Sequence, residues 1–233
     1  MIRLIGLDAD DTLWDNEIVY IEAKKRFVSL LAPRVSPKES EEHLSRVETV
    51  NLPRFGYGIR SFTLSMVQAA AELMGAHLTS RHVEDVLEIG EGMLSAPVQL
   101  LAGAKDVLEA LSSSHPLMLV TKGDSFEQER KIRLSGLRDY FVRIEVVSDK
   151  SRETYRAVLE QQGVPAHEFL MARNSLRSDI LPVLEVGGHA AYIPYEDTWE
   201  HENAGVEPVG ERRYHRNASL SQLPDLVTRL AGG

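Results

Sequence analysis

The segment RLIGLDADDT, residues 3–12, places a short apolar run directly before a cluster of acidic residues. The apolar part, RLIGL, has the length and composition of a buried strand in a parallel sheet. Parallel strands deliver the side chains at their carboxyl ends to the edge of the sheet where α/β proteins bind ligands. We therefore expect Asp8 and Asp10, which follow the strand, to lie at such an edge.

After residue 100 the sequence alternates between apolar runs and amphipathic stretches. The expected strands are 116–121, 142–147, 168–172 and 189–193, and the expected helices are near 104–112, 125–135, 152–162 and 179–187. The segment 194–217 is expected to run over the surface before a last strand and helix. Such alternation predicts the α/β class, with a doubly wound parallel sheet covered by helices on both faces.

The stretch between the first two strands has helical periodicity and no convincing strand. Its apolar positions indicate four helices, and residues 36–39, Ser-Pro-Lys-Glu, read as a capping box with proline in the first turn. We expect two domains: residues 1–14 and 99–233 form the core, and residues 15–98 form an inserted α-helical domain.

The amino-acid composition argues against several classes of partner and of site. The 233 residues carry a formal net charge of −9 without a dense basic block, so neither a nucleic acid nor a membrane surface is expected as a partner. Cysteine is absent, which excludes disulfides, thiolate metal sites and a cysteine nucleophile. With no window resembling a signal peptide or a membrane span, we expect a soluble, cytoplasmic protein.

Two carboxylates spaced two residues apart after a strand suit covalent and acid-base chemistry. Asp8 can attack a substrate while Asp10 leans over the same site and moves protons. The alternative for such a cluster is an acidic turn or a helix cap, which is common for aspartates.

Four motifs in order resemble those of the haloacid dehalogenase superfamily. LIGLDADDTLW matches the first motif, a hydrophobic strand followed by DxDxT, and PLMLVTKGD offers Thr121 for the second. VVSDKSRETY offers Lys150 for the third, and FLMARNSLRSD offers Asn174 and Asp179 for the fourth. The resemblance covers almost the whole chain, and it implies a Rossmann-like catalytic core with the insert as an α-helical cap.

The resemblance also implies a cofactor and a set of roles. Mg²⁺ would be held by a carboxylate oxygen of Asp8, the backbone carbonyl of Asp10 and a ligand from Asn174 or Asp179, because Mg²⁺ prefers hard oxygen ligands. Thr121, with Lys122 beside it, would bind the phosphoryl group of a substrate. Lys150 would neutralise charge and hold Asp8 in place.

The fourth motif departs from the common Gly-Asp form, because Arg173-Asn174 stands there. Pro182 is tolerated only in the first turn of a helix, so we expect that helix to begin no earlier than about Ser178 and Asn174 to lie on a loop. Asp179 would then be a helix cap, a partner of the metal or a partner of the lysine. We expect Arg173 to point outward, because a long side chain beside a metal would crowd the phosphate.

Within the insert, NLPRFGYGIRSF, residues 51–62, breaks the helical pattern with Pro53 and two glycines. A loop of this composition facing the site could read the leaving group of a substrate through Arg54, Tyr57 and Arg60. The alternative is an ordinary connection between helices, with its arginines extended into solvent.

The function indicated is Mg²⁺-dependent hydrolysis of a small phosphomonoester, through an aspartyl-phosphate on Asp8. A dehalogenase of the same fold would lack the second acid, which Asp10 supplies. A phosphomutase on the same fold stays open, and so does a non-catalytic ligand-binding protein with a degenerate site, suggested by Arg173. The sequence specifies neither the phosphorylated substrate nor the oligomeric state.

Overall fold

The computed structural model describes residues 1–195 and 207–231, and a six-stranded sheet forms the centre of the larger part. The strands lie in the order β5-β4-β1-β6-β7-β8, and every neighbouring pair is parallel. Their bounds are Leu4–Leu7 (β1), Leu117–Lys122 (β4), Phe141–Val147 (β5), Phe169–Arg173 (β6), His189–Tyr192 (β7) and Tyr214–Arg216 (β8). Because the chain winds outward from β1 in both directions, the predicted doubly wound α/β sheet is confirmed.

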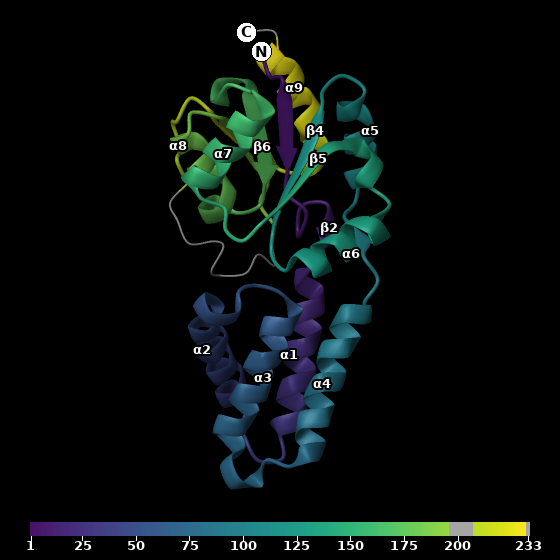
Figure 1. Cartoon of the computed structure of the whole chain (residues 1–233), viewed down its shortest axis with the longest axis vertical. Coiled ribbons are helices and arrows are strands. Elements are labelled where there is room, and N and C mark those ends of the chain that lie inside the picture. The colour runs from purple at the N-terminus through teal and green to yellow at the C-terminus, as the bar shows by residue number, and fades with distance from the viewer. Residues whose placement is uncertain (196–206, 232–233) are drawn as a thin grey trace. The chain divides into compact units, whose positions relative to one another are not determined.

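Helices cover both faces of this sheet (Figure 1). They are α5 Ala104–Ser112, α6 Ser125–Ser135, α7 Arg152–Gln162, α8 Leu181–Glu185 and α9 Leu223–Ala231, with short 3₁₀ turns at Arg138–Tyr140, Ala166–Glu168 and Leu220–Gln222. A two-stranded ribbon pairs β2 Trp14–Asp15 with β3 Gln99–Leu100. Part of the expected surface segment, residues 196–206, lies outside the described residues, and β8 lies near the end of that segment.

The two faces follow from the alternation of side chains along each strand. Ile5 and Leu7 belong to a core that includes residues of α5, α6 and α9, whereas Leu4 belongs to a second core with residues of α7 and α8. Gly6 faces the second core, where a Cβ atom would lie 2.5 Å from the ring of Phe169 on β6. A side chain at position 6 would therefore push β1 away from the Phe169 ring. Because Asp8 directly follows β1, its position would change too.

The helix after β6 begins earlier than expected. A π-helical turn, Leu176–Ile180, precedes α8, and the side chain of Ser175 caps it by accepting a hydrogen bond from the amide of Ser178 at 3.1 Å. The expected start at about Ser178 is therefore wrong, because the Pro182 constraint applies only to the α-helical part that follows. Asn174 does lie on the loop before the turn, as expected.

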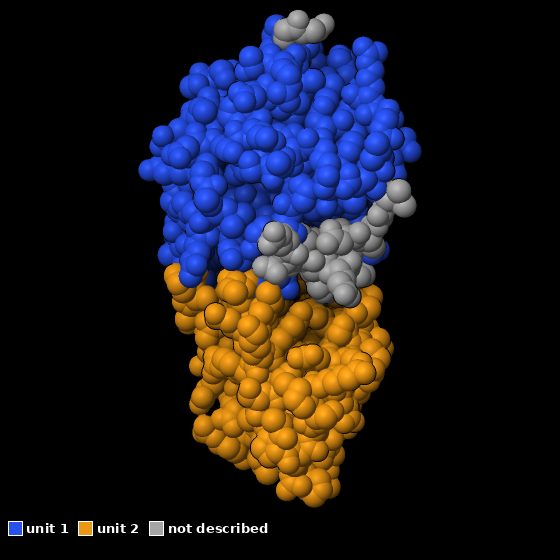
Figure 2. Space-filling model, turned by 180° about the vertical axis from the view of Figure 1, so that it is seen from behind, with its two compact units in different colours: residues 1–17, 98–233 blue, residues 18–97 orange. Residues whose placement is uncertain are grey.

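The inserted residues form four helices with a core of their own. Their bounds are α1 Glu17–Leu31, α2 Pro37–Phe55, α3 Ile59–Met74 and α4 Ser80–Ser95, with a 3₁₀ turn at Gly75–His77. Phe27, Leu44, Met66 and Val86, one from each helix, are buried together. The chain divides into two compact units, residues 1–17 with 98–233 and residues 18–97, which Figure 2 colours separately. Among the described residues no helix is both long enough and apolar enough to cross a bilayer.

The expected break in residues 51–62 is shorter than the sequence suggested. Pro53 and Arg54 lie inside the last turns of α2, and only residues 56–58 separate α2 from α3. Gly56 and Gly58 have φ values of 74° and 110°, in the region that favours glycine, so they make a sharp turn between the two helices.

Two histidines meet at the edge of the sheet. His189 on β7 and His215 on β8 stack with their ring centroids 5.4 Å apart, and Nδ1 of the first lies 3.1 Å from Nε2 of the second. Burial and the nearby positive charges of His215 and Arg213 lower the pKa of His189 to about 4, and burial also lowers the pKa of His215. The pair is therefore uncharged in the folded protein at neutral pH.

This pair should make the protein less stable in acid. Between about pH 4 and 6.5 the unfolded chain binds protons that the folded chain does not, so the free energy of unfolding should rise with pH across this window and level off above it. In His189→Gln the rise should be shallower, with about one proton fewer taken up on unfolding. Urea unfolding at several pH values measures this slope. His77→Gln, which removes an exposed histidine of the helical unit, is the control, and an equal slope in wild type and His189→Gln would contradict the assignment.

Candidate active site

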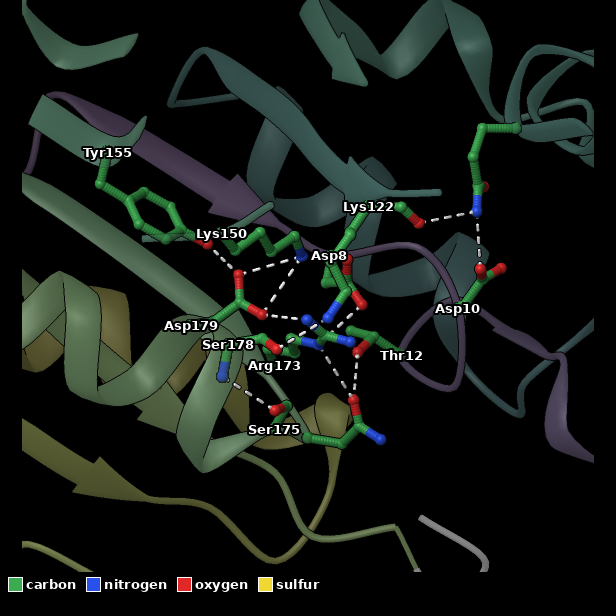
Figure 3. A network of polar contacts seen from close by, with 12 residues as sticks. Asp8, Asp10, Thr12, Lys122, Lys150, Tyr155, Arg173, Ser175, Ser178 and Asp179 are labelled. Atoms are coloured by element: carbon green, nitrogen blue, oxygen red, sulfur yellow. Dashed lines mark hydrogen bonds and ion pairs between the residues drawn. The ribbon is translucent and has the colours of Figure 1, made fainter. Parts of the chain in front are cut away.

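Asp8 lies at the carboxyl end of β1 and is only 1% exposed. Lys150, which follows β5 in the chain, donates a short hydrogen bond to Oδ1 of Asp8. The same ammonium group lies 3.0 Å from Oδ1 and 3.2 Å from Oδ2 of Asp179. Lys150 thus holds two buried carboxylates at once (Figure 3), and its contact with Asp8 is the one expected from the sequence.

Arg173, the last residue of β6, points into this cluster, and the expectation that it faces outward is wrong. Its Nε lies 2.9 Å from Oδ2 of Asp8 and 3.4 Å from Oδ1 of Asn174, and its Nη1 donates a short hydrogen bond to Oδ2 of Asp179. The residue is only 7% exposed. Because Leu7 and Ala172 are paired across β1 and β6, Arg173 and Asp8 end their strands side by side, and the two buried carboxylates attract the guanidinium inward.

Asp179 anchors the cluster from the π-helical turn. It is fully buried, and besides Lys150 and Arg173 it accepts a short hydrogen bond from the hydroxyl of Tyr155 on α7. The cap of this turn is Ser175, so of the roles weighed for Asp179 the structure supports that of lysine partner. Tyr155 was not found from the sequence, because on an amphipathic helix it looks like any apolar core residue.

Thr121 and Lys122 end β4, the strand that pairs with β1 on the side opposite β6. Thr121 is 1% exposed, and its hydroxyl has no hydrogen-bond partner within the described residues. Lys122 donates from Nζ to the hydroxyl of Ser178 at 3.1 Å. On the other side, the hydroxyl of Thr12 donates to Asn174 at 3.4 Å. The residues assigned from the second motif therefore stand at the same sheet edge as Asp8.

Asp10 lies to one side of the cluster around Asp8 (Figure 3). Lys131 on α6 donates to both of its oxygens, at 2.7 and 2.8 Å, and Gln128 and Trp14 donate at 2.8 and 2.6 Å. Burial alone would raise the pKa of Asp10, but the charge of Lys131 and these hydrogen bonds outweigh it and leave the pKa below its ordinary value. Lys131 and Gln128 were missed because they lie on α6, more than a hundred residues from the motif.

The neighbouring Asp11 has a different role. Its φ is 58°, and its Oδ1 accepts hydrogen bonds from the amides of Asn16 and Glu17 at 2.8 and 2.9 Å, at the start of α1. Burial, followed by the charge of Asp10, raises the pKa of Asp11 to about 7. The acidic cap weighed as an alternative for the whole cluster thus describes Asp11.

Arg54, Tyr57 and Arg60 belong to the helical unit. Arg54 lies in the last turn of α2, Tyr57 in the short connection and Arg60 in the first turn of α3. The fold thus gathers them at one end of two neighbouring helices. Their role in substrate binding stays a prediction.

The side chains expected to hold Mg²⁺ do not fit that role as they are arranged. Each of the three, Asp8, Asn174 and Asp179, turns an oxygen to the guanidinium of Arg173. The other oxygen of Asp8 accepts from Lys150. Across residues 1–195 and 207–231, no group of three or more His, Cys, Asp or Glu side chains is arranged to hold a metal ion. A positively charged guanidinium in contact with every expected side-chain ligand leaves no set of free anionic oxygens for a second cation.

A buried aspartate at the end of the first strand, held by a lysine that follows a later strand, forms the candidate site at the edge of the doubly wound sheet. The family model described as haloacid dehalogenase-like hydrolase matches residues 2–181, and the chain belongs to this family. It is thus a hydrolase by family.

The chain is similar to three proteins of known name. The structure of a haloacid dehalogenase-like family hydrolase from Xanthomonas campestris is similar with a TM-score of 0.88 and 39% identity, over 99% of this chain and 96% of that one. The pyrimidine 5'-nucleotidase YjjG of Escherichia coli is 24% identical over 151 residues, which are 61% of this chain and 64% of the relative. The L-2-haloacid dehalogenase of Xanthobacter autotrophicus, with chloropropionic acid covalently bound, shares the fold with a TM-score of 0.66 at 14% identity, over 98% and 99% of the two chains.

The ion pair between Asp10 and Lys131 should contribute to stability. Lys131→Met should lower the free energy of unfolding by about 2 kcal/mol at pH 7, because the carboxylate loses its charged donor while it stays largely buried. Since the pKa of Asp10 is lowered in the folded state, the contribution of the pair is present above about pH 4 and is lost as pH falls below it.

Urea unfolding at pH 7 and pH 3 measures both effects. The matched control is Lys105→Met, which removes an exposed lysine from a surface pair with Glu109 at 3.8 Å and should change stability by less than about 1 kcal/mol. Equal losses in the two variants would show that the Asp10 pair contributes no more than a surface pair.

Proposed function

We propose that the chain hydrolyses a small phosphomonoester, with Asp8 as the nucleophile. The observation that carries this proposal is a pair of buried polar atoms at neighbouring strand ends. Oδ2 of Asp8 and Oγ1 of Thr121 both lack a hydrogen bond within the described residues. Arg173 Nε lies 2.9 Å from that Oδ2, but its N–H does not point at the oxygen, so the contact is ionic. A nucleophilic acceptor and a hydroxyl donor that lack hydrogen bonds at neighbouring strand ends are suited to a ligand that carries oxygens.

The first step would form a bond between an Asp8 oxygen and the phosphorus. The bond from phosphorus to the leaving oxygen breaks, and that oxygen takes up a proton, which the carboxylic acid form of Asp10 would supply. Lys150 and Arg173 reduce the repulsion between the carboxylate and the phosphate dianion, which would otherwise keep them apart. Thr121 would donate its unpartnered hydroxyl to a phosphoryl oxygen, and Lys122 would add positive charge beside it.

In the second step, water attacks the phosphorus of the aspartyl-phosphate. Inorganic phosphate leaves, and the carboxylate of Asp8 is restored. Asp10 would take the proton from this water, and its lowered pKa keeps it ionised and able to accept one. Protonating the leaving oxygen in the first step requires the neutral form of Asp10. Lys131 makes this form less favourable, because it stabilises the charged carboxylate.

Dehalogenase chemistry is the second candidate, because relatives of this fold include an enzyme whose structure holds chloropropionic acid covalently. When a carbon–halogen bond breaks, the halide leaves as an anion that needs no proton, so a dehalogenase site has no use for Asp10. Here three side chains from α6 and β2 fix that carboxylate in place, which supports a role for it.

A phosphomutase is the third candidate. Turnover without a phosphorylated activator would distinguish a hydrolase from a phosphomutase.

A substrate class can also be proposed from a relative and from the helical unit. A curated relative is named a pyrimidine 5'-nucleotidase, so nucleoside 5'-monophosphates belong first in a screen of phosphorylated metabolites. Arg54, Tyr57 and Arg60 are the proposed readers of the leaving group, since a tyrosine can stack on a ring and arginines can bind further anionic groups.

Asp8→Asn should abolish hydrolysis of an aryl phosphate, because an amide is far too weak a nucleophile. A discontinuous phosphate-release assay on protein free of contaminating phosphatase measures this. Asp149→Asn, which neutralises an exposed aspartate of the same unit, should leave turnover unchanged. Substantial activity in Asp8→Asn would mean that the nucleophile is another residue.

Asp10→Asn should slow turnover by about 10²- to 10⁴-fold, the usual contribution of general acid-base catalysis. The loss should be smaller for an aryl phosphate than for an alkyl phosphate, because a good leaving group needs less protonation. Comparing kcat for the two substrate types in both proteins measures the difference. A loss below about threefold for both substrate types would remove Asp10 from the proton transfers.

A further inference from the structure

We infer that the guanidinium of Arg173 occupies the position, and performs the electrostatic task, of a divalent cation in this site. The catalytic part of this inference rests on the proposed function. The expected binding of Mg²⁺ and phosphate does not depend on it. It begins from one geometric fact: a single guanidinium contacts the three side chains, Asp8, Asn174 and Asp179, that the family pattern assigns to metal binding.

The formal charges of the buried cluster support this inference. Asp8 and Asp179 carry two negative charges, and Lys150 and Arg173 carry two positive charges, so the cluster is neutral as it stands. The side chains of all four are between 0% and 9% exposed, so solvent screens them little. Adding a divalent cation would leave two uncompensated positive charges in a low-dielectric place, which is strongly unfavourable.

The guanidinium also has donors to spare. Nε and Nη1 make all the hydrogen bonds of Arg173 among the described residues, so the two N–H groups of Nη2 donate none there. A phosphoryl group attacked by Asp8 would lie beside the residue that offers them. Arginine binds phosphate oxygens through two parallel N–H donors, so it can both neutralise and orient the group.

Unlike a bound metal ion, the guanidinium of Arg173 cannot exchange with ions in solution. Its charge is part of the chain, so no chelator removes it and no free cation concentration controls it. The site of the wild-type protein should then bind phosphate without added metal. Removing the side chain should leave Asp8, Asp179 and the Asn174 carbonyl oxygen around an empty space with one net negative charge, which suits Mg²⁺.

The binding test uses protein stripped with EDTA and then dialysed free of it. Titration calorimetry with MgCl₂ should show no specific binding to the wild type and saturable binding to Arg173→Gly, because a buried positive charge has been removed. Inorganic phosphate should bind the wild type without Mg²⁺, and should bind Arg173→Gly at least about tenfold more weakly unless Mg²⁺ is present. Arg133→Ala, which removes an exposed arginine from α6, should behave as the wild type in both titrations.

Arg173→Lys covers the case in which the glycine variant does not fold. It keeps the charge but loses the planar fork, so it should still reject Mg²⁺ while binding phosphate more weakly. Thermal unfolding gives a second readout: MgCl₂ should raise the Tm of Arg173→Gly and leave that of the wild type unchanged. Specific Mg²⁺ binding to the wild type, or a rise in its Tm with MgCl₂, would overturn the inference.

Activity provides a separate arm. Hydrolysis by the wild type should persist in excess EDTA, whereas hydrolysis by Arg173→Gly should depend on Mg²⁺. Wild-type turnover that EDTA abolishes and Mg²⁺ restores would refute the role of Arg173 but leave the phosphatase proposal standing. If no phosphomonoester is turned over in any condition, the phosphatase proposal fails, and the Mg²⁺ titrations still decide the role of Arg173.

Discussion

The arrangement of this site depends on one constraint: the carboxylate of Asp8 is buried at the end of a strand, and its charge must be compensated there. Compensation comes from Lys150 on one oxygen and Arg173 on the other. Each of these cations then needs a second anion to stay ordered away from water, and Asp179 serves both. The result is a closed square of alternating charges in which the loss of any one member leaves one buried charge uncompensated.

The fold supplies the members of this square from separate elements. β1 and β6 bring Asp8 and Arg173 side by side through their parallel register. Lys150 follows β5, and Asp179 reaches the site from a π-helical turn capped by Ser175. A π-helical turn is an unusual conformation that often marks functional positions, and here it directs a fully buried carboxylate at two cations. The sheet edge thus acts as a common meeting point for charges that lie far apart in the sequence.

Much of the fold could be predicted from the sequence because its determinants are local. Apolar periodicity marked the strands and helices of the sheet, and the order of the motifs placed Asp8, Thr121 and Lys150 at one edge. The direction of the Arg173 side chain could not be read in this way, because it depends on carboxylates contributed by two other segments. Lys131 and Tyr155 were missed for the same reason: on an amphipathic helix nothing distinguishes a residue that pairs with a remote acid from an ordinary one.

Asp10 and Asp11 show how far such tertiary partners determine chemistry. They are adjacent and chemically identical, yet the pKa of one is lowered by Lys131 and that of the other is raised to about 7 by burial and by the charge of the first. Arg173 extends the same logic to the nucleophile. A side chain of fixed charge stands where the family pattern has glycine, so the electrostatics around Asp8 are set by the chain itself. On our proposal, Arg173 balances the buried carboxylate of Asp8 with a covalently attached cation, whereas glycine at this position would leave that task to an exchangeable ion from solution.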